Sequence, residues 1–245
     1  MPIPPPLDLA AHWWGPFGRR PNPLTLQQLI ANQTLDSELA AWLWVLIEAG
    51  ASVLVCAGPG GAGKTTLLTG LTAFLSPDRS PYAVRGAFDA LDAISGQRPA
   101  ETVLLINEVS AHLPIYTWGA GARRVFDAGH AGAQLLATAH ATNRHELAKE
   151  LTGPLINATD ADLRLWDLVL FIDAWRQGPR VIRRVADLLC CSLDGPVTRL
   201  VVDTRGGELR PDASPMQRLA RRFGFAGATI EAEVRRRQTA FGLAP

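Results

Sequence analysis

The stretch from Ser52 to Leu68 reads SVLVCAGPGGAGKTTLL, and it decides the fold class of this chain. A short apolar run leads directly into GPGGAGKT, which matches the phosphate-binding pattern GxxxxGK[ST] at every fixed position. Helix formers follow the motif, so the stretch predicts a buried strand, a glycine-rich loop and a helix in that order. A glycine-rich turn that binds nothing is the alternative, and the agreement of motif and context argues against it.

Each part of the motif has a role in holding a nucleotide. Backbone N–H groups can close around phosphate oxygens where side chains are small, and the following helix directs its positive N-terminus at the same anion. Lys64 supplies a point charge for the β- and γ-phosphates, and Thr65 supplies a hydroxyl ligand for Mg²⁺. The predicted cofactors are therefore ATP and Mg²⁺. The residues expected to bind the nucleotide are Gly58, Pro59, Gly60, Gly61, Ala62, Gly63, Lys64, Thr65 and Thr66.

Composition narrows the class of protein. The chain has 245 residues, of which 47% are hydrophobic and 19% are charged, so it can bury a substantial core. Its net charge of +1 argues against a nucleic-acid partner. The three cysteines show no CxxC or other metal-binding spacing, which favours a reducing, cytoplasmic location.

Two segments have the position or length of a targeting or membrane element. The first 14 residues, MPIPPPLDLAAHWW, lack the basic segment and long apolar run of a signal peptide. The apolar stretch 39–57 is about long enough to cross a bilayer. Glu48 and Gly50 interrupt it, however, and the phosphate loop follows at once. We therefore predict a helix followed by a buried strand.

Residues 1–33 are predicted to form an arm rich in proline and tryptophan. Seven prolines in the first 23 residues exclude a regular helix there. Two interpretations remain open at this point. The arm is either flexible, or it docks Trp13 and Trp14 on another surface, since an exposed tryptophan pair is costly in water.

Apolar runs and turn signals predict the remaining elements. Strands are expected at 53–57, 82–84, 103–106, 134–137, 168–172, 180–186 and 197–202. Helices are expected at 25–30, 35–49, 64–75, 123–128, 144–151, 214–223 and from 229 onward, and a helix is favoured over a loop at 86–95. Thr34 and Ser214 are the expected N-caps of two of these helices, and Gly50 the expected left-handed C-terminal residue.

The order of these elements predicts the architecture. Strands alternate with helices up to residue 168, which is typical of a parallel α/β sheet, and the later strands follow short turns, which indicates an antiparallel extension. The predicted division is an arm at 1–33, a P-loop NTPase core at 34–210 and a C-terminal helical segment at 211–245. The arginine run 235–237 is interpreted as a solvated helix end, with a nucleic-acid surface as the alternative.

Two further residues are candidates for catalysis because of where their strands end. Glu108 follows the buried run VLLIN, at the carboxyl end of a strand, where ligands gather in an open α/β sheet. It could orient or deprotonate the attacking water, or hold Mg²⁺ through water. His140 ends the next buried strand and could sense the γ-phosphate; a structural histidine, with Asn143 as a simple helix cap, is the alternative.

These motifs together resemble the secretion traffic ATPases, the hexameric motors of type II and type IV secretion and of type IV pili. ELAAWLWVLIEAGASVLVCAGPGGAGKTTLL resembles the family's helix, strand and Walker A motif, and LLINEVS resembles its Walker B, with Asn107 in place of the usual glycine. AGHAGAQLLATAHATN resembles its Gly-His element and histidine box, which implies roles for Gly129, His130, His140 and Asn143. WDLVLFIDAWRQGPRVIRRVADL resembles the antiparallel segment that follows.

The resemblance covers about residues 35 to 205 and implies a RecA-like core, a homo-oligomer (a hexamer in the family) and a membrane-embedded secretion or pilus platform as partner. The location is then cytoplasmic, peripheral on the inner face of the membrane. Two departures are visible. Some 33 residues precede the core, where the family has a large domain, and no acid among Asp78, Asp89 and Asp92 matches the family's Asp box.

The leading functional hypothesis is an ATPase with Lys64, Glu108 and His140 as catalytic residues. Arg85, Arg98, Arg123 or Arg124 could reach the phosphate of a neighbouring subunit. The first alternative is a nucleotide-dependent switch or regulatory subunit with little hydrolysis, which the two departures favour. A small-molecule kinase is a third hypothesis, for which the sequence shows no acceptor site.

Overall fold

The computed structural model describes residues 2–9, 13, 23–58, 60–190, 198–201 and 213–242. Seven strands in these ranges form one sheet in the order β2-β3-β4-β1-β5-β6-β7. The strands are β1 (Val53–Cys56), β2 (Ser80–Val84), β3 (Thr102–Val109), β4 (Gln134–Ala139), β5 (Leu168–Gln177), β6 (Arg180–Cys190) and β7 (Thr198–Val201). The helices are α1 (Leu26–Ala31), α2 (Ser37–Ala49), α3 (Lys64–Leu71), α4 (Gly119–His130), α5 (Arg144–Thr152), α6 (Asp160–Leu163), α7 (Ala213–Arg222) and α8 (Gly227–Ala240).

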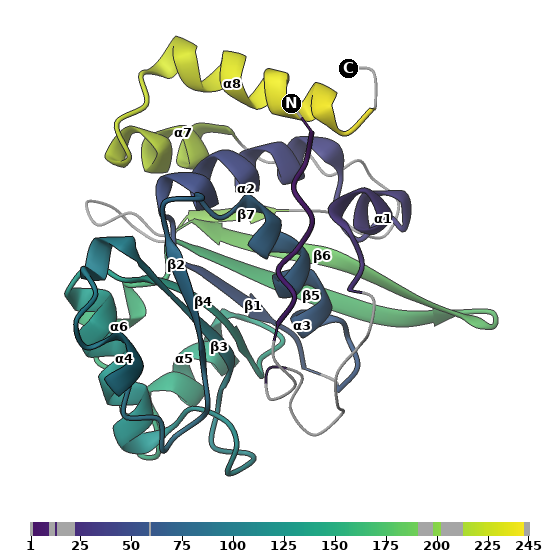
Figure 1. The fold of residues 1–245 in the computed structure, drawn as a ribbon. Helices are drawn as coiled ribbons and strands as arrows, with labels where there is room; N and C mark the ends of the chain where they lie inside the picture. The colour runs from purple at the N-terminus through teal and green to yellow at the C-terminus, as the bar shows by residue number, and fades with distance from the viewer. Residues whose placement is uncertain are drawn as a thin grey trace.

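The sheet has a parallel part and an antiparallel part. Strands β2, β3, β4, β1 and β5 pair in parallel, whereas β6 and β7 pair antiparallel at the β5 edge. Helices flank both faces (Figure 1). The predicted fold class is therefore confirmed: a mixed α/β fold with a mostly parallel sheet, an antiparallel extension and C-terminal helices.

Alternation along the central strands explains how one sheet supports two cores. Val53 and Val55 of β1 pack in the core that holds α1, α2, α3, α7 and α8. Leu54 and Cys56 face the opposite core, beneath α4 and α5. Because side chains of a strand point alternately to the two faces, a central strand covered on both sides must be apolar at every position. All four residues of β1 are buried, as this requires.

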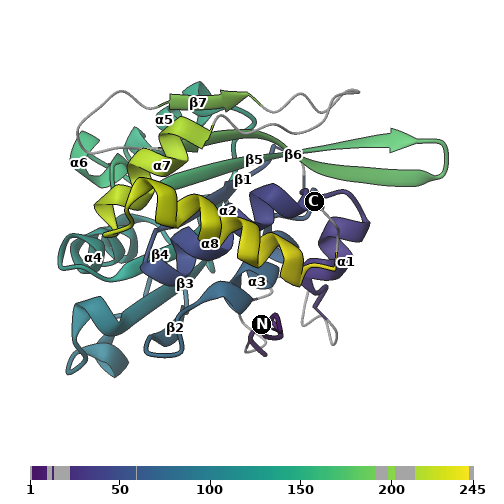
Figure 2. The same ribbon diagram turned by 90° about the horizontal axis from the view of Figure 1, so that it is seen from above.

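Helix α2 is more completely buried than its apolar stripe predicts. Nine consecutive residues, 39–47, are all buried. The C-terminal helices account for this, since α7 and α8 lie over α2 on the side away from the sheet (Figures 1 and 2). A helix covered on two sides is apolar nearly all round. None of the helices in the described ranges is both long and apolar enough to cross a membrane.

Of the two residues predicted to cap α2, the N-cap Thr34 is wrong and the C-terminal Gly50 is confirmed. Asp36 is the N-cap, in place of Thr34, and its carboxylate accepts a hydrogen bond from the backbone N–H of Leu39 at 2.7 Å. The Thr34 carbonyl instead accepts from the N–H of Val185 in β6. Gly50 adopts the predicted left-handed conformation, with a φ of 111°.

The predicted helix at 86–95 is wrong. Apart from a short 3₁₀ turn at Asp92–Ile94, this segment is a loop organised by the side chain of Asp89. The carboxylate accepts hydrogen bonds from the backbone N–H groups of Arg85, at 2.8 Å, and Leu91, at 3.0 Å. An aspartate that bonds local backbone in this way competes with helix formation.

The described part of the N-terminal arm is docked. Trp13 is fully buried, and its indole N–H donates to the Thr69 hydroxyl of α3 at 3.0 Å. The backbone N–H of Leu7 donates to the Thr72 hydroxyl at 2.9 Å, so the segment 2–9 runs along the end of α3 (Figure 1). The docking interpretation is thereby supported for Trp13, while Trp14 lies outside the described residues.

The arginine run at the C-terminus is partly structural. Arg237 is buried, pairs with Glu48 of α2 and with Glu233, and stacks its guanidinium over the Trp44 ring at 4.9 Å. Arg235 and Arg236 remain exposed and pair with glutamates of α8. The interpretation as a solvated helix end is therefore wrong for Arg237, which fastens α8 onto α2. Ser214 lies inside α7, which begins at Ala213, and so does not precede the helix as a cap.

Candidate nucleotide site at the carboxyl edge of the sheet

The parallel strands bring the predicted catalytic residues to one edge. Strands β3, β4 and β1 are adjacent and run in the same direction, so their carboxyl ends emerge together. The phosphate loop follows β1, Glu108 is the next-to-last residue of β3, and His140 directly follows β4. The structure therefore assembles, from three separate stretches of sequence, the group that the sequence predicts.

The backbone of the phosphate loop requires glycine at specific places. Gly61 and Gly63 have φ values of 77° and 99°, in the left-handed region that side chains disfavour. Gly63 directly precedes α3, so the loop opens at the N-terminus of that helix. Gly58 has a different restriction, because a Cβ there would lie 2.3 Å from Cγ2 of Thr142 in the turn after β4.

The remaining loop residues lie where the motif predicts. Lys64 and Thr65 are the first two residues of α3 and Thr66 is the third, so all three belong to its first turn. Ala62 is buried and Gly60 is exposed. Pro59 lies outside the described residues. Thr65 is half-buried at the helix N-terminus, a position from which a hydroxyl can serve as a metal ligand.

Lys64 and Glu108 form the central ion pair of the site. The Lys64 ammonium lies 3.3 Å from a Glu108 carboxylate oxygen, and the two side chains are only 10% and 9% exposed. A buried charge is retained only when it is paired. A nucleotide phosphate would offer Lys64 a second anionic partner and would compete with Glu108 for it.

His140 lies beside this pair and is half-buried. Burial lowers the pKa of His140, and the nearby Lys64 charge lowers that pKa further, while Glu108 opposes the shift. The lowered pKa favours the neutral ring, which is the form that accepts a hydrogen bond or binds a metal. Its ring makes an edge-to-face contact with the His112 ring, with 5.0 Å between the centroids.

His112 is a site residue that sequence reasoning missed. It belongs to the segment HLPIYTWGAGA, residues 112–122, which follows β3 and to which the sequence analysis assigns no role. The segment returns to the strand, because the N–H of Thr117 donates to the Glu108 carbonyl at 2.9 Å and that of Ser110 donates to the Thr117 carbonyl at 3.2 Å. This closure holds His112 over the carboxyl edge. The only sequence signal was a histidine four residues after Glu108.

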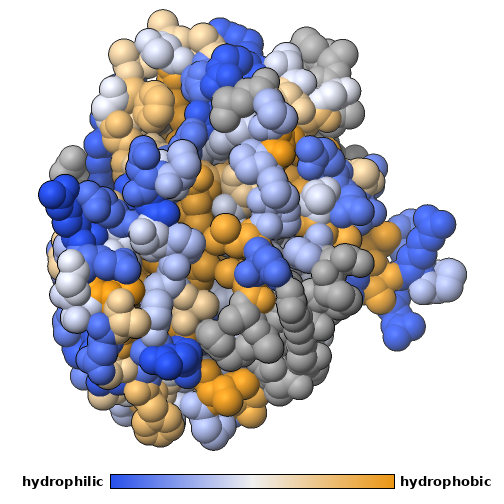
Figure 3. Space-filling model, in the orientation of Figure 1, coloured by the Kyte–Doolittle hydropathy of each residue, from blue (hydrophilic) through white to orange (hydrophobic). Residues whose placement is uncertain are grey.

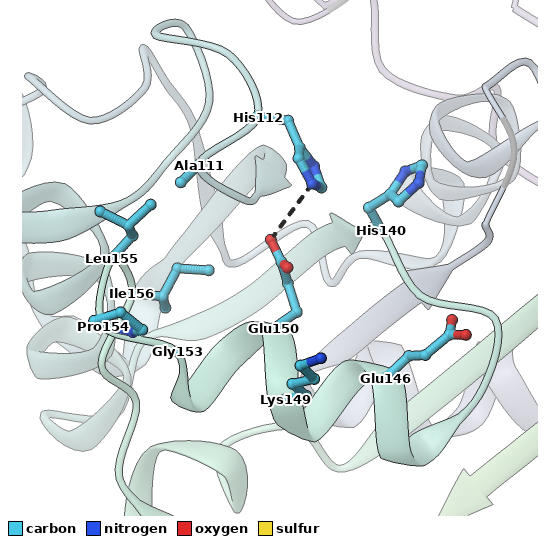
Figure 4. Close-up of a pocket in the computed structure, with 10 residues that line it drawn as sticks. All are labelled: Ala111, His112, His140, Glu146, Lys149, Glu150, Gly153, Pro154, Leu155 and Ile156. Carbon is cyan, nitrogen blue, oxygen red and sulfur yellow. Dashed lines mark ion pairs between the residues drawn. The ribbon is translucent and has the colours of Figure 1, made fainter.

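An open pocket of about 370 Å³ adjoins the two histidines (Figure 4). Figure 4 shows His112 and His140 at its upper rim and Glu150 rising from α5 toward His112, with 4.0 Å between the Glu150 carboxylate and the His112 ring. The opposite wall is formed by the chain after α5, at residues 153–156. The pocket thus lies between the two histidines, helix α5 and the chain that follows α5.

Arg183 is a second residue that the sequence analysis missed. It lies on β6, and its Nε donates to the carbonyl of Gly61 at 3.0 Å. The hairpin of β5 and β6 therefore contributes a cation to the phosphate loop. Farther out the same hairpin projects from the body, and its far end is largely hydrophilic (Figure 3).

The four arginines proposed from the sequence have partners elsewhere in the chain. Arg85 pairs with Asp89, Arg98 with Glu101, and Arg123 with Asp127 and Asp162. Arg124 donates to the backbone carbonyls of Asp89 and Ala87. Arg183, rather than any of these, is the arginine that contacts the phosphate loop within the described chain.

Gly129 and His130, the residues of the Gly-His element, lie at the amino edge of the sheet, opposite the phosphate loop. Gly129 and His130 end α4, just before β4 begins, whereas the phosphate loop lies where the parallel strands end. His130 hydrogen-bonds Asp162 at 2.7 Å, and Gly129 packs against Leu135 and Leu165. Asn143 caps α5 by accepting from the N–H groups of His145 and Glu146, so its observed role is the helix cap.

Asn107, which directly precedes Glu108, makes two contacts of its own. Its side-chain amide donates to the backbone carbonyl of Trp13, and its carbonyl accepts from the Thr138 hydroxyl of β4. The docked arm is thereby tied to the residue next to Glu108. The arm and the site are one packed unit at this point.

The chain is similar to a curated protein and to a solved structure. No family model matches the chain. A curated relative from Methanocaldococcus jannaschii, described as "Uncharacterized protein MJ0900", is 28% identical over 211 residues, which cover 73% of this chain and 36% of the relative. The solved structure of the ATPase DotB from Legionella pneumophila matches with a TM-score of 0.39 and 13% identity, over 89% of this chain and 58% of that chain. The chain thus spans about a third of the relative's length.

Proposed function

We propose that this protein binds Mg-ATP and hydrolyses it. The observation that carries the proposal is the buried pairing of Lys64 with Glu108, 3.3 Å apart, at the open carboxyl edge of a parallel sheet. A phosphate loop with an adjacent buried carboxylate supplies both requirements of the reaction, a cradle for the phosphates and a group that orients or deprotonates water. His140 on the neighbouring strand end would then contact the γ-phosphate or its water.

The residues of this edge fit the cofactors. The Thr65 hydroxyl and the Glu108 carboxylate are hard oxygen donors of the kind that Mg²⁺ prefers, with Glu108 acting through water. The positive N-terminus of α3, Lys64 and Arg183 provide the charge that a triphosphate needs. Bound Mg²⁺ would neutralise charge on the β- and γ-phosphates.

We propose further that the protein works as a homo-oligomer, hexameric if it follows the secretion traffic ATPases, on a membrane-embedded secretion or pilus platform from the cytoplasmic side. The resemblance of four motifs to that family supports this proposal. ATP-dependent assembly is the first consequence to measure, by light scattering with and without a non-hydrolysable ATP analogue. A molecular mass that stays monomeric over a wide range of protein concentration would count against it.

ATP binding and steady-state turnover, measured side by side, test the proposed activity. Lys64→Ala should lose nucleotide binding, since it removes the cation that meets the phosphates. Glu108→Gln should still bind ATP but lose about 10²- to 10⁴-fold in turnover, the usual contribution of a positioned acid–base group. Equal turnover in Glu108→Gln and the unsubstituted protein would overturn the assignment of Glu108.

A nucleotide-dependent switch with little hydrolysis is the second candidate, and one contact favours it. Asp89, an acid in the stretch where the family carries its general base, is buried and bonded to Arg85 and Tyr82. Those bonds leave it without a role toward ATP. Tight nucleotide binding with no turnover, even in the assembled state, would select this candidate. Transfer of phosphate to a small acceptor would select a kinase instead.

A further inference from the structure

The group formed by Glu108, His112 and His140 has the chemistry of a transition-metal site. Each residue offers one ligand atom, and the three atoms lie within 4.8 Å of one another. Two ligands of one zinc ion lie at most about 4.2 Å apart, because each bond to nitrogen or oxygen is about 2.1 Å long. Small side-chain rotations would therefore bring all three atoms onto a single ion.

We propose that Glu108, His112 and His140 bind a divalent transition-metal ion of the Zn²⁺ class. Two imidazoles and one carboxylate form a ligand set that suits zinc, whereas magnesium prefers oxygen donors and keeps most of its waters. The site is distinct in ligand chemistry from the Mg²⁺ site of the nucleotide, because both histidines supply nitrogen. One open coordination position or more would face the pocket.

Contacts around His112 support its role as a ligand. The Ser110 hydroxyl lies 2.6 Å from Nδ1 of the ring, so one ring nitrogen is held by a hydrogen bond and Nε2 remains available. Ligating histidines in proteins are usually oriented through their second nitrogen in this way. Nε2 also lies 4.0 Å from the Glu150 carboxylate, which adds a negative charge near the ion.

Lys64 makes the site responsive to nucleotide. In the described state its ammonium occupies the cation's place against Glu108, 3.3 Å from the carboxylate. A bound triphosphate would give Lys64 another anionic partner and free Glu108 for the metal. We therefore expect nucleotide to strengthen metal binding, and this coupling rests on the proposed function, whereas the metal site itself does not.

The test is a titration with Zn²⁺, followed by calorimetry, and with Co²⁺, followed by its visible absorption, in buffer containing excess Mg²⁺. His112→Ala and His140→Ala should each weaken binding at least about tenfold, the lower end of the losses caused by disturbing a metal site. His145→Ala is the matched control, since His145 is an exposed histidine on the adjacent helix α5, and it should leave the affinity unchanged. The His112 side chain is 52% exposed on a loop, so its loss does not threaten the fold.

Lys64→Ala separates this proposal from the proposed function. It should bind Zn²⁺ more tightly without nucleotide, because the competing ammonium is gone, while the response to an ATP analogue disappears. Equal Zn²⁺ affinity in His112→Ala, His145→Ala and the unsubstituted protein would overturn the metal site, whatever the nucleotide result. Failure of the unsubstituted protein to bind nucleotide, with the His112 dependence of Zn²⁺ binding intact, would overturn the proposed function and leave the metal site standing.

Discussion

A buried carboxylate lies among histidine and basic side chains at each of two edges of the parallel sheet, the amino edge, where the strands begin, and the carboxyl edge, where they end. The two carboxylates differ in how many hydrogen bonds and ion pairs they make. At the amino edge, Asp162 accepts two hydrogen bonds from Arg123, at 2.8 and 2.9 Å, and one from His130. It also accepts from the backbone N–H and the hydroxyl of Thr159, which caps α6. At the carboxyl edge, the side chain of Glu108 has one ion pair, to Lys64, within the described chain.

The difference separates a structural carboxylate from one that is prepared for a ligand. The bonds to Asp162 hold its pKa well below the usual value, with the Arg123 guanidinium as the largest cause. Every lone pair there has a partner in the folded chain. Glu108 is also buried, though less completely than Asp162, and it keeps acceptor capacity for water, metal or a proton. A carboxylate with basic and histidine neighbours therefore stabilises the fold at the amino edge and forms a candidate ligand site at the carboxyl edge.

Replacing each carboxylate by its amide should give the largest difference between the two edges, measured as the loss in free energy of unfolding. Asp162→Asn should lower the free energy of unfolding by about 3 kcal/mol, since it removes a buried, fully bonded carboxylate and leaves Arg123 with Asp127 as its remaining ionic partner. Glu108→Gln should change it less, by about 1.5 kcal/mol, because the amide oxygen can still accept from Lys64 although the buried ammonium loses its counter-charge. Urea unfolding of both variants measures the contrast, and equal losses would show that Glu108 is structural as well.

The same comparison predicts a pH dependence. The pKa of Asp162 is lower in the folded state than in the unfolded chain, so its bonds contribute stability above the unfolded value near 3.8. That contribution is lost as the pH falls through the folded pKa. Asp162→Asn should therefore flatten the acid limb of a plot of unfolding free energy against pH. The pKa of Glu233, which is lowered to about 2 by Arg236 and Arg237, keeps part of the slope, so only a complete lack of change contradicts the prediction.

Gly58→Ala, in the phosphate loop, should lower stability by less than Asp162→Asn does. A second substitution, Thr142→Ser, should restore most of the loss. In Gly58→Ala the new methyl group would lie 2.3 Å from Cγ2 of Thr142, and such overpacking costs about 2 kcal/mol. Thr142→Ser removes that Cγ2 and keeps the hydroxyl that donates to Glu146. The double variant should recover most of the loss in thermal unfolding and in ATP affinity. Failure of Thr142→Ser to restore either quantity would mean that the clash is not the cause.

The sequence alone predicts the elements and site residues that depend on local sequence patterns. The phosphate-loop motif and the apolar runs predicted β1, β3 and β4, and parallel pairing then placed Lys64, Glu108 and His140 at one edge. Contacts over long sequence distances were not predictable in this way. Arg183 reaches Gly61 across 122 residues, and the Gly-His element gave no sign that His130 pairs with Asp162 at the other edge.

Side-chain bonds to local backbone account for the errors in secondary structure. The segment 86–95 has no proline or strong periodicity against a helix, but Asp89 bonds backbone on both sides of itself. Likewise Asp36 outcompetes Thr34 as the N-cap of α2, because the Thr34 carbonyl is used by β6. Which of two capable residues bonds the backbone depends on the packed structure around them.

The smallest effect expected concerns the arm that borders the open edge. Trp13→Phe should cost about 1 kcal/mol, since it removes the buried hydrogen bond from the indole to Thr69 while keeping an aromatic ring. Thr69→Val removes the other partner without changing the shape much, so the double variant should cost less than the two single losses added together. Hydrogen exchange should rise in α3, which carries Lys64 and Thr69, and stay unchanged in α6, where Asp162 is bonded independently. An equal rise in both helices would mean that the arm stabilises the whole fold and is not specific to the open edge.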